Sequence, residues 1–150
     1  MMEQYSVIPY QEQHHDRLVD IWLRAVRETH PFLTEEDILF YYDLVRGGVL
    51  NEVEIWVALN DSEEPVGFIG LSGKHIEMLF IDPACHKKGL GSRLIRHVES
   101  LKGARLTVDV NEQNPGACAF YQKYGFVQIG RSELDGSGRP FPLLHMELQK

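Results

Sequence analysis

The chain has 150 residues, of which 43% are hydrophobic, 10% aromatic and 25% charged, which is typical of a globular protein with one core. Fifteen Lys and Arg against twenty-two Asp and Glu give a formal net charge of −7. This balance argues against binding to nucleic acid or to an anionic membrane, since both need a basic surface. We therefore expect residues 1–150 to form a single domain that binds neither.

The N-terminal third of the chain predicts one strand and two helices. A short strand is expected at residues 4–9, followed by a helix at 13–29 whose apolar side chains recur on one face. His30-Pro31 ends this helix, because the residue before proline is pushed out of the helical region. Thr34 then caps a second helix that begins with acidic residues, and Gly47-Gly48 ends it.

The remainder of the chain alternates between short strands and helices. Three strands, a helix, a strand, a short helix and two strands are expected at 54–59, 66–72, 75–81, 89–101, 105–110, 117–124, 126–130 and 143–148. Consecutive strands followed by a strand–helix–strand unit indicate an α/β (α+β) fold in which helices flank a mixed sheet.

Cysteine usage and the N-terminal sequence point to a reducing compartment. Cys85 and Cys118 alone do not form a disulfide framework, and no zinc-type spacing of Cys and His occurs. The first residues lack the basic and apolar segments of a secretory signal, and no apolar run approaches the ~18 residues that a membrane helix needs. We expect a cytoplasmic protein without a metal site.

The clearest chemical signal lies between Leu79 and Gly91, where a strand leads through a lysine-containing loop into a helix. The start of a helix holds anions through its unpaired N–H groups and positive dipole end, and Gly89 lets the backbone approach a ligand closely. The segment is no Rossmann fingerprint, because Leu94 replaces the third glycine, and it is no P-loop. It predicts a phosphate site of another kind, with a solvated glycine turn as the alternative.

Two sequence blocks narrow the kind of phosphate-containing ligand that this site would bind. The first is Leu79-x-Ile81-x4-His86-x-x-Gly89-x-Gly91, and the second, N-x-x-A-x-x-F-Y-x-x-x-G-F, runs from Asn114 to Phe126. In these blocks the chain resembles the small bacterial members of the GNAT superfamily of acetyl-CoA-dependent N-acetyltransferases, although the family usually has Gln or Arg in place of His86. The resemblance implies a largely antiparallel seven-stranded mixed sheet, flanked by about four helices and splayed at its central strands.

The resemblance also implies a reaction. Acetyl-CoA would give its acetyl group directly to a primary amine in a ternary complex, without a metal. The acceptor stays open: it is a small amine, or a lysine or N-terminal amine of a peptide or protein. The alternative is a coenzyme A-binding sensor or partner module of the same fold without catalysis. The expected partners are acetyl-CoA and the amine, and the chain would be a monomer or a homodimer.

Residues of both blocks are implied to hold acetyl-CoA. Backbone groups at the end of the strand would hold the pantetheine arm and polarise the thioester carbonyl. The following loop and helix start would contact the pyrophosphate, and an asparagine would contact pantetheine from the other side. The residues implied are Leu79, Phe80, Ile81, His86, Lys87, Lys88, Gly89, Leu90, Gly91, Ser92 and Asn114.

Two catalytic residues are implied. Tyr121 is expected to protonate the departing thiolate; its structural alternative is a core aromatic residue. Glu77 is expected to be the general base, because several family members place a carboxylate in this strand. His75 and Glu112 are the competing bases.

Strand alternation predicts which way Glu77 faces. It places Glu77 on the same face as Leu79 and Ile81, and it places the neighbouring apolar residues Ile76, Met78 and Phe80 on the opposite face.

The resemblance further implies that the acceptor enters between the first two helices and the loop before the last strand. This implies His30, Phe32, Tyr42 and Phe141 as wall residues of the acceptor site. For the aromatic residues of the helices, packing in the core is the alternative.

Overall fold

A computed structural model describes residues 5–85 and 88–149. The four helices are α1 (His15–Thr29), α2 (Glu35–Arg46), α3 (Leu90–Lys102) and α4 (Pro115–Tyr124). The seven strands are β1 (Ser6–Pro9), β2 (Glu54–Leu59), β3 (Pro65–Ser72), β4 (His75–Ile81), β5 (Thr107–Asn111), β6 (Phe126–Ser132) and β7 (Leu143–Leu148). The predicted order of elements is confirmed.

A few boundaries differ from the prediction for local reasons. The strand expected at 105–110 begins at Thr107, since Arg105 has a positive φ of 69° that a strand does not allow. The helix expected to follow Pro115 begins at that residue, because proline is well suited to the first helical position. A 3-10 turn over residues 12–14 takes the place of the first predicted turn of α1.

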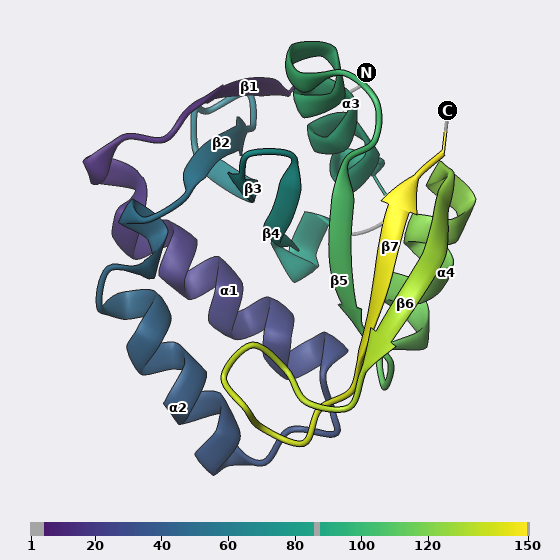
Figure 1. Cartoon of the computed structure of the whole chain (residues 1–150). Helices are drawn as coiled ribbons and strands as arrows, with labels where there is room; N and C mark the ends of the chain where they lie inside the picture. The colour runs from purple at the N-terminus through teal and green to yellow at the C-terminus, as the bar shows by residue number, and fades with distance from the viewer. Residues whose placement is uncertain (1–4, 86–87, 150) are drawn as a thin grey trace.

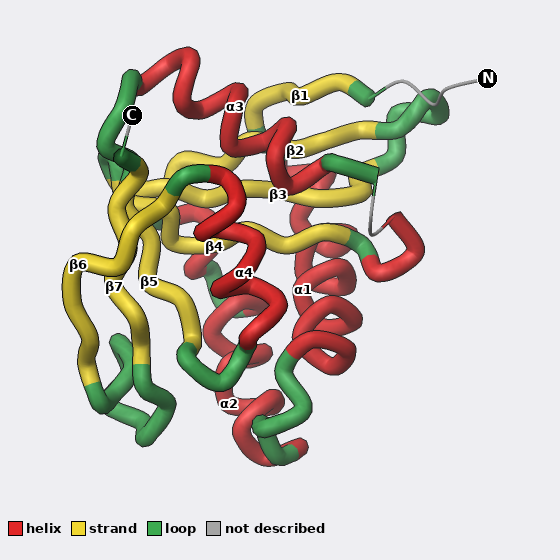
Figure 2. Tube along the Cα trace, turned by 90° about the vertical axis from the view of Figure 1, so that its right-hand side faces the viewer, coloured by secondary structure: helices red, strands yellow, loops and turns green. Residues whose placement is uncertain are grey.

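The strands form one mixed sheet in the order β1-β2-β3-β4-β5-β7-β6. Every neighbouring pair is antiparallel except β4 and β5, which are parallel and pair only at His75–Thr107 and Ile76–Val108. Beyond these two positions the strands diverge, as Figure 2 shows. The expected splay at the central strands is thereby confirmed, and it opens the sheet in its middle.

The helices cover the two faces of the sheet in pairs (Figure 1). One core cluster contains α1 and α2 residues with Phe68 and Met78 of the sheet. The other contains α3 and α4 residues with Ile69 and Ile76. The amphipathic pattern of α1 places Leu18 and Ile21 against the sheet, where both are fully buried.

A β-bulge in β4 changes the predicted alternation. Gly70 pairs with Met78, but the next residue of β3, Leu71, pairs with Ile76, so Glu77 is the extra residue. Ile76 therefore packs in the α3–α4 cluster, whereas Met78 packs in the α1–α2 cluster. The prediction that these two residues share a face is wrong, because pure alternation does not anticipate the extra residue.

Among the described residues, no helix is long and apolar enough to cross a membrane.

Candidate active site

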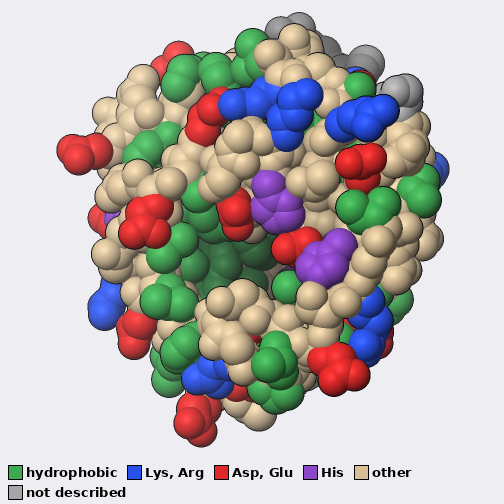
Figure 3. Space-filling model, viewed as in Figure 1, with side chains coloured by type: hydrophobic (Ala, Val, Ile, Leu, Met, Phe, Trp, Pro, Cys, Tyr) green, Lys and Arg blue, Asp and Glu red, His purple; other side chains and the backbone are tan. Residues whose placement is uncertain are grey.

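A cavity of about 780 Å³ lies where β4 and β5 diverge. Its wall joins residues of α3 and α4 on one side of the sheet to Ala25 and Thr29 of α1 on the other, so the cavity passes through the open middle of the sheet. Figure 3 shows a hollow with a hydrophobic floor and with acidic and histidine side chains on its rim. A ligand can thus be reached from both faces of the sheet.

Most of the residues proposed from the sequence meet in this cavity. Its lining includes Glu77, Leu79, Phe80, Ile81, Gly89, Leu90, Gly91, Ser92, Asn114, Tyr121 and His30. Lys88, Phe32, Tyr42 and Phe141 lie outside the lining. His86 and Lys87 lie outside the described residues.

The free edge of β4 can hold an extended ligand. β4 pairs with β3 along its length, but it pairs with β5 only through His75 and Ile76. From Glu77 onward the β5 side of β4 is open toward the cavity, and an extended chain can add to such an edge by main-chain hydrogen bonds. This geometry suits an arm that carries amide groups.

The start of α3 lies at the same cavity. Gly89 caps the helix in a left-handed conformation with φ 76°, and the first intrahelical bond runs from Arg93 N–H to its carbonyl at 3.0 Å. Leu90, Gly91 and Ser92 line the cavity, and their backbone N–H groups precede that first bond and so have no partner within the helix. Three backbone donors at the positive end of a helix can bind a phosphate.

Helix α4 contributes Asn114 and Tyr121. Asn114 caps the helix, its side-chain oxygen accepting from Ala117 N–H at 3.1 Å, so its amide nitrogen can donate to a ligand. Tyr121 packs edge to face on Phe120 and Phe126, with ring centroids 5.1 and 5.3 Å away. Burial raises the pKa of Tyr121 above its usual range. Its phenol is therefore protonated at neutral pH.

The three candidate bases have different surroundings. Glu77 is exposed and lines the cavity. Glu112 lies outside the lining and pairs with Arg131 at 2.5 Å, and the hydrogen bond from that guanidinium lowers the pKa of the carboxyl. His75 also lies outside the lining, with its Nδ1 2.8 Å from Thr107 Oγ1. Glu77 is thus the candidate base with access to the cavity.

His30 is the one predicted acceptor residue that reaches the cavity. Burial lowers its pKa to about 4, so the imidazole is neutral at pH 7. Thr29 Oγ1 donates to Ala25 O at 2.8 Å and lies 2.7 Å from His30 Nδ1. Because a hydroxyl has only one proton, Nδ1 carries the imidazole hydrogen and Nε2 is left as an acceptor.

Aromatic packing extends from His30 to the loop before β7. His30 contacts Phe32, and Phe32 contacts Phe141, with ring centroids 5.3 and 6.0 Å apart. Tyr41 contacts Phe141 as well and hydrogen-bonds to Asp135 of the loop. Tyr42 packs against the α1–α2 cluster and lies under the guanidinium of Arg46. Of these two tyrosines, Tyr41 is thus the one that contacts the loop before β7.

Sequence reasoning missed two features near the cavity. Asp109 lines it from β5 and bonds to His145 of β7. Asp82, only 3% exposed, receives two hydrogen bonds from Arg24 of α1 and so ties the end of β4 to that helix. An aspartate between two valines of a strand, Val108 and Val110, was the available signal for the first. The second depends on residues far apart in the chain.

No group of three or more His, Cys, Asp or Glu side chains in residues 5–85 and 88–149 is arranged to hold a metal ion.

Comparisons with known proteins bear on this site. A family model described as an acetyltransferase (GNAT) domain matches residues 41–150. The peptidyl-lysine N-acetyltransferase YjaB of Escherichia coli (strain K12) is 47% identical over 131 residues, which cover 87% of this chain and 88% of that protein.

Solved structures agree with the sequence matches. The solution structure of apo-form YjaB from Escherichia coli superposes with a TM-score of 0.90 at 43% identity, covering 97% of each chain. The PaiA N-acetyltransferase of Thermoplasma acidophilum, solved in complex with coenzyme A, superposes with a TM-score of 0.81 over 98% of this chain and 99% of that one. At 18% identity the latter likeness concerns the fold.

Proposed function

This chain belongs to the GNAT acetyltransferase family, and from that premise we propose that it transfers the acetyl group of acetyl-CoA to the side-chain amine of a lysine in a peptide or protein. The family and the N-acetyltransferase activity expected from the two sequence blocks are confirmed. The lysine acceptor is supported by the name of the relative YjaB.

One structural observation carries the proposal. A single cavity joins the backbone donors of α3 and Tyr121 to a face of the sheet where carboxylates lie. The donor molecule can therefore enter from the α3–α4 side while a cationic side chain enters from the other side. The thioester and the amine would meet at the gap between β4 and β5.

The roles of the residues follow from this arrangement. Acetyl-CoA supplies the activated acetyl group as a thioester. The start of α3 binds the pyrophosphate, the open edge of β4 and Asn114 bind the pantetheine arm, and a backbone N–H near Phe80 donates to the thioester oxygen as its negative charge develops. Glu77 accepts the proton that the attacking amine must lose.

Tyr121 would complete the proton balance by donating to the sulfur as the thiolate leaves. Its raised pKa lies above that of an ordinary phenol, ~10, whereas a thiol such as that of cysteine has a pKa near ~8.5. Complete proton transfer is then uphill by about 2 kcal/mol or more. We therefore place the contribution of Tyr121 at the low end of the ~10²–10⁴-fold range for general acids.

The function is tested with purified protein, acetyl-CoA and three peptides. One peptide has a single lysine and a blocked N-terminus, the second has norleucine in place of that lysine, and the third has a free N-terminus and no lysine. We expect release of the coenzyme A thiol, and acetylation seen by mass spectrometry, with the first peptide. Turnover of the third peptide alone would make the protein an N-terminal acetyltransferase. Acetyl-CoA binding without turnover of any amine would favour a sensor module.

The role of Tyr121 is tested by Tyr121→Phe. We expect kcat to fall about 10²-fold while KM for acetyl-CoA stays near wild type, because only the proton donor is lost. Tyr10→Phe is the matched control, since it removes a phenol whose hydroxyl lies 3.3 Å from His15, outside the cavity lining. An unchanged kcat in Tyr121→Phe would remove this residue from the mechanism.

A further inference from the structure

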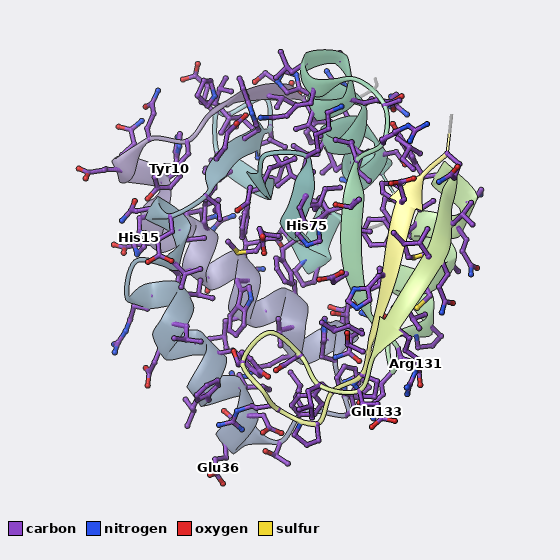
Figure 4. All side chains as sticks on the ribbon, viewed as in Figure 1. Tyr10, His15, Glu36, His75, Arg131 and Glu133 are labelled. Atoms are coloured by element: carbon purple, nitrogen blue, oxygen red, sulfur yellow. The ribbon has the colours of Figure 1, made fainter. Side chains whose placement is uncertain are left out.

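Asp109 lies at the centre of a chain of polar side chains that crosses four strands. Its Oδ1 is 2.6 Å from His145 Nδ1, and the other nitrogen of this imidazole is 2.6 Å from Ser132 Oγ. Its Oδ2 is 3.5 Å from His75 Nε2, and His75 Nδ1 is 2.8 Å from Thr107 Oγ1. Figure 4 shows His75 between β4 and β5, at the point where these strands begin to diverge.

The position of Asp109 in β5 sets its direction. Val108 and Val110 pack in the core under α3 and α4, so strand alternation turns Asp109 to the opposite face. Figure 1 shows that face of β5, β6 and β7 without a helix over it. The side chain is 34% exposed and lines the cavity. Asp109 therefore faces the side from which an acceptor would approach.

The histidines hold this carboxylate in place and leave part of it available. A carboxylate only accepts, so His145 Nδ1 donates its hydrogen to Asp109, and Nε2 of the neutral ring then accepts from Ser132. Thr107 fixes the ring of His75 on the other side. A carboxylate has about four acceptor positions; His145 uses one of them, and His75 Nε2 lies 3.5 Å from the other oxygen. The remaining positions can accept N–H bonds from a ligand.

The charge of the surroundings favours a cation. Glu77 lines the cavity from β4 and Asp109 lines it from β5, so the two strands that border the gap each bring a carboxylate. Among the described residues of the lining, Lys123 of α4 is the only lysine or arginine, and it belongs to the side where the phosphates of the donor would lie. Two carboxylates at a partly closed gap attract an ammonium group more strongly than they would in water.

We propose that Asp109 is the residue that binds the acceptor amine in its ammonium form, and that His145 and His75 are positioning residues for its carboxylate. This rests on the proposed acetyl transfer and assigns the recognition of the acceptor to a group separate from the general base. The ammonium is bound at Asp109 as it arrives, and Glu77 takes its proton before attack. Acceptors are thereby selected for a positive charge next to the thioester.

The first test is Asp109→Asn, which keeps the shape and removes the charge. We expect KM for the lysine peptide to rise about 10- to 100-fold, as for a lost charge-assisted hydrogen bond. KM for acetyl-CoA should change less than twofold. Glu147→Gln is the matched control, because Glu147 lies two residues from His145 on the same face of β7 and outside the cavity lining. An equal rise of KM in both variants would overturn the proposal, because it would reflect net charge alone.

The positioning role is tested by His145→Phe, which keeps a ring and removes both hydrogen bonds. We expect a rise of about 3- to 10-fold in KM for the peptide with unchanged KM for acetyl-CoA and unchanged kcat. A fall of kcat with no change of KM would contradict a positioning role, since recognition of the acceptor would be intact.

A binding experiment separates this inference from the proposed function and needs no variant. Coenzyme A-loaded wild-type protein is titrated with n-butylammonium chloride and with neutral n-butanol, and backbone amide NMR signals of β5 and β7 are followed. We expect saturable shifts at Asp109 and His145 with the cation and none with the alcohol. Absence of these shifts overturns the inference. If they occur while no lysine peptide is acetylated, the inference stands and the peptide acceptor is wrong. If peptides are acetylated and Asp109→Asn leaves KM for the peptide within twofold, the lysine acceptor stands and the inference about Asp109 is wrong.

Discussion

Replacing Arg24 with methionine should destabilise the fold because it leaves a buried carboxylate without its main partner. Arg24 donates to both oxygens of Asp82, at 2.7 and 2.9 Å, and the Asp82 side chain is 4% exposed. Two weaker contacts stay in the variant: Arg17 at 3.5 Å and the backbone N–H of Ala84 at 3.0 Å. Methionine retains the apolar part of the arginine side chain.

The expected cost follows from this burial. Breaking a buried ion pair by removing one partner costs roughly 3–5 kcal/mol. The Arg24 side chain is itself 39% exposed, so solvent screens part of the attraction, and two partners of Asp82 remain. We therefore expect the free energy of unfolding to fall by about 2–3 kcal/mol. For a chain of this length that corresponds to a decrease in Tm of about 4–12 °C.

The assay is urea and thermal unfolding of the wild type, Arg24→Met, Asp82→Asn and the double variant. Asp82→Asn removes the charge that would otherwise stay buried, so the double variant should be about 1 kcal/mol more stable than Arg24→Met alone. A loss below about 0.5 kcal/mol in Arg24→Met, the size of an exposed pair, would refute the reasoning. So would a double variant as unstable as the sum of the two single changes.

The same pair predicts a pH dependence with a definite sign. The hydrogen bonds from Arg24 hold the pKa of the Asp82 carboxyl below its usual range. A depressed pKa contributes stability that is fully present above the unfolded value of ~3.9 and is lost as pH falls through the lower folded value. Arg24→Met should therefore flatten the decrease in stability below about pH 4. If Arg24→Met loses stability below about pH 4 as steeply as the wild type does, that loss comes from other carboxyl groups.

Two further predictions concern the cavity. A Cβ at Gly91 would lie 3.0 Å from Phe120 Cζ, so Gly91→Ala should push that ring and raise KM for acetyl-CoA several-fold in steady-state kinetics. Gly136→Ala is the control, because a Cβ there meets nothing within 4 Å. An unchanged KM in Gly91→Ala would show that the Phe120 ring moves aside without cost. Glu77→Gln should lower kcat about 10²-fold and remove the acidic limb of the pH–rate profile; a variant that keeps this limb would exclude Glu77 as the base.

Local sequence patterns predicted the elements well because they depend on near neighbours. The helical spacing of Leu18 and Ile21 and the cap at Thr34, which accepts from Asp37 N–H at 3.1 Å, need no distant contact. Gly89 and most of the described residues named in the two sequence blocks likewise meet in one cavity, where we propose that the donor binds.

Residue directions were harder to predict because they depend on partners far along the chain. The bulge at Glu77 arises from pairing with Gly70 and Leu71 of β3, and a single extra residue reverses the face of Ile76. In α2, the adjacent residues Tyr41 and Tyr42 have different partners: Tyr41 contacts the loop before β7, whereas Tyr42 lies under Arg46. A step of one residue turns a helix by about 100°, so spacing alone does not decide which tyrosine meets that loop.

By itself, then, the amino-acid sequence determined the order of the elements, the family and the segment that would receive the donor. Each of these features depends on residues that are close together in the chain. Only the tertiary structure decided what surrounds the proposed acceptor site. His75, Asp109, Ser132 and His145 are spread over 71 positions, and they meet because β4 pairs with β5, β5 with β7 and β7 with β6 in a given register. Such a register results from the whole sheet, because each strand is placed by the pairing and packing of all the others.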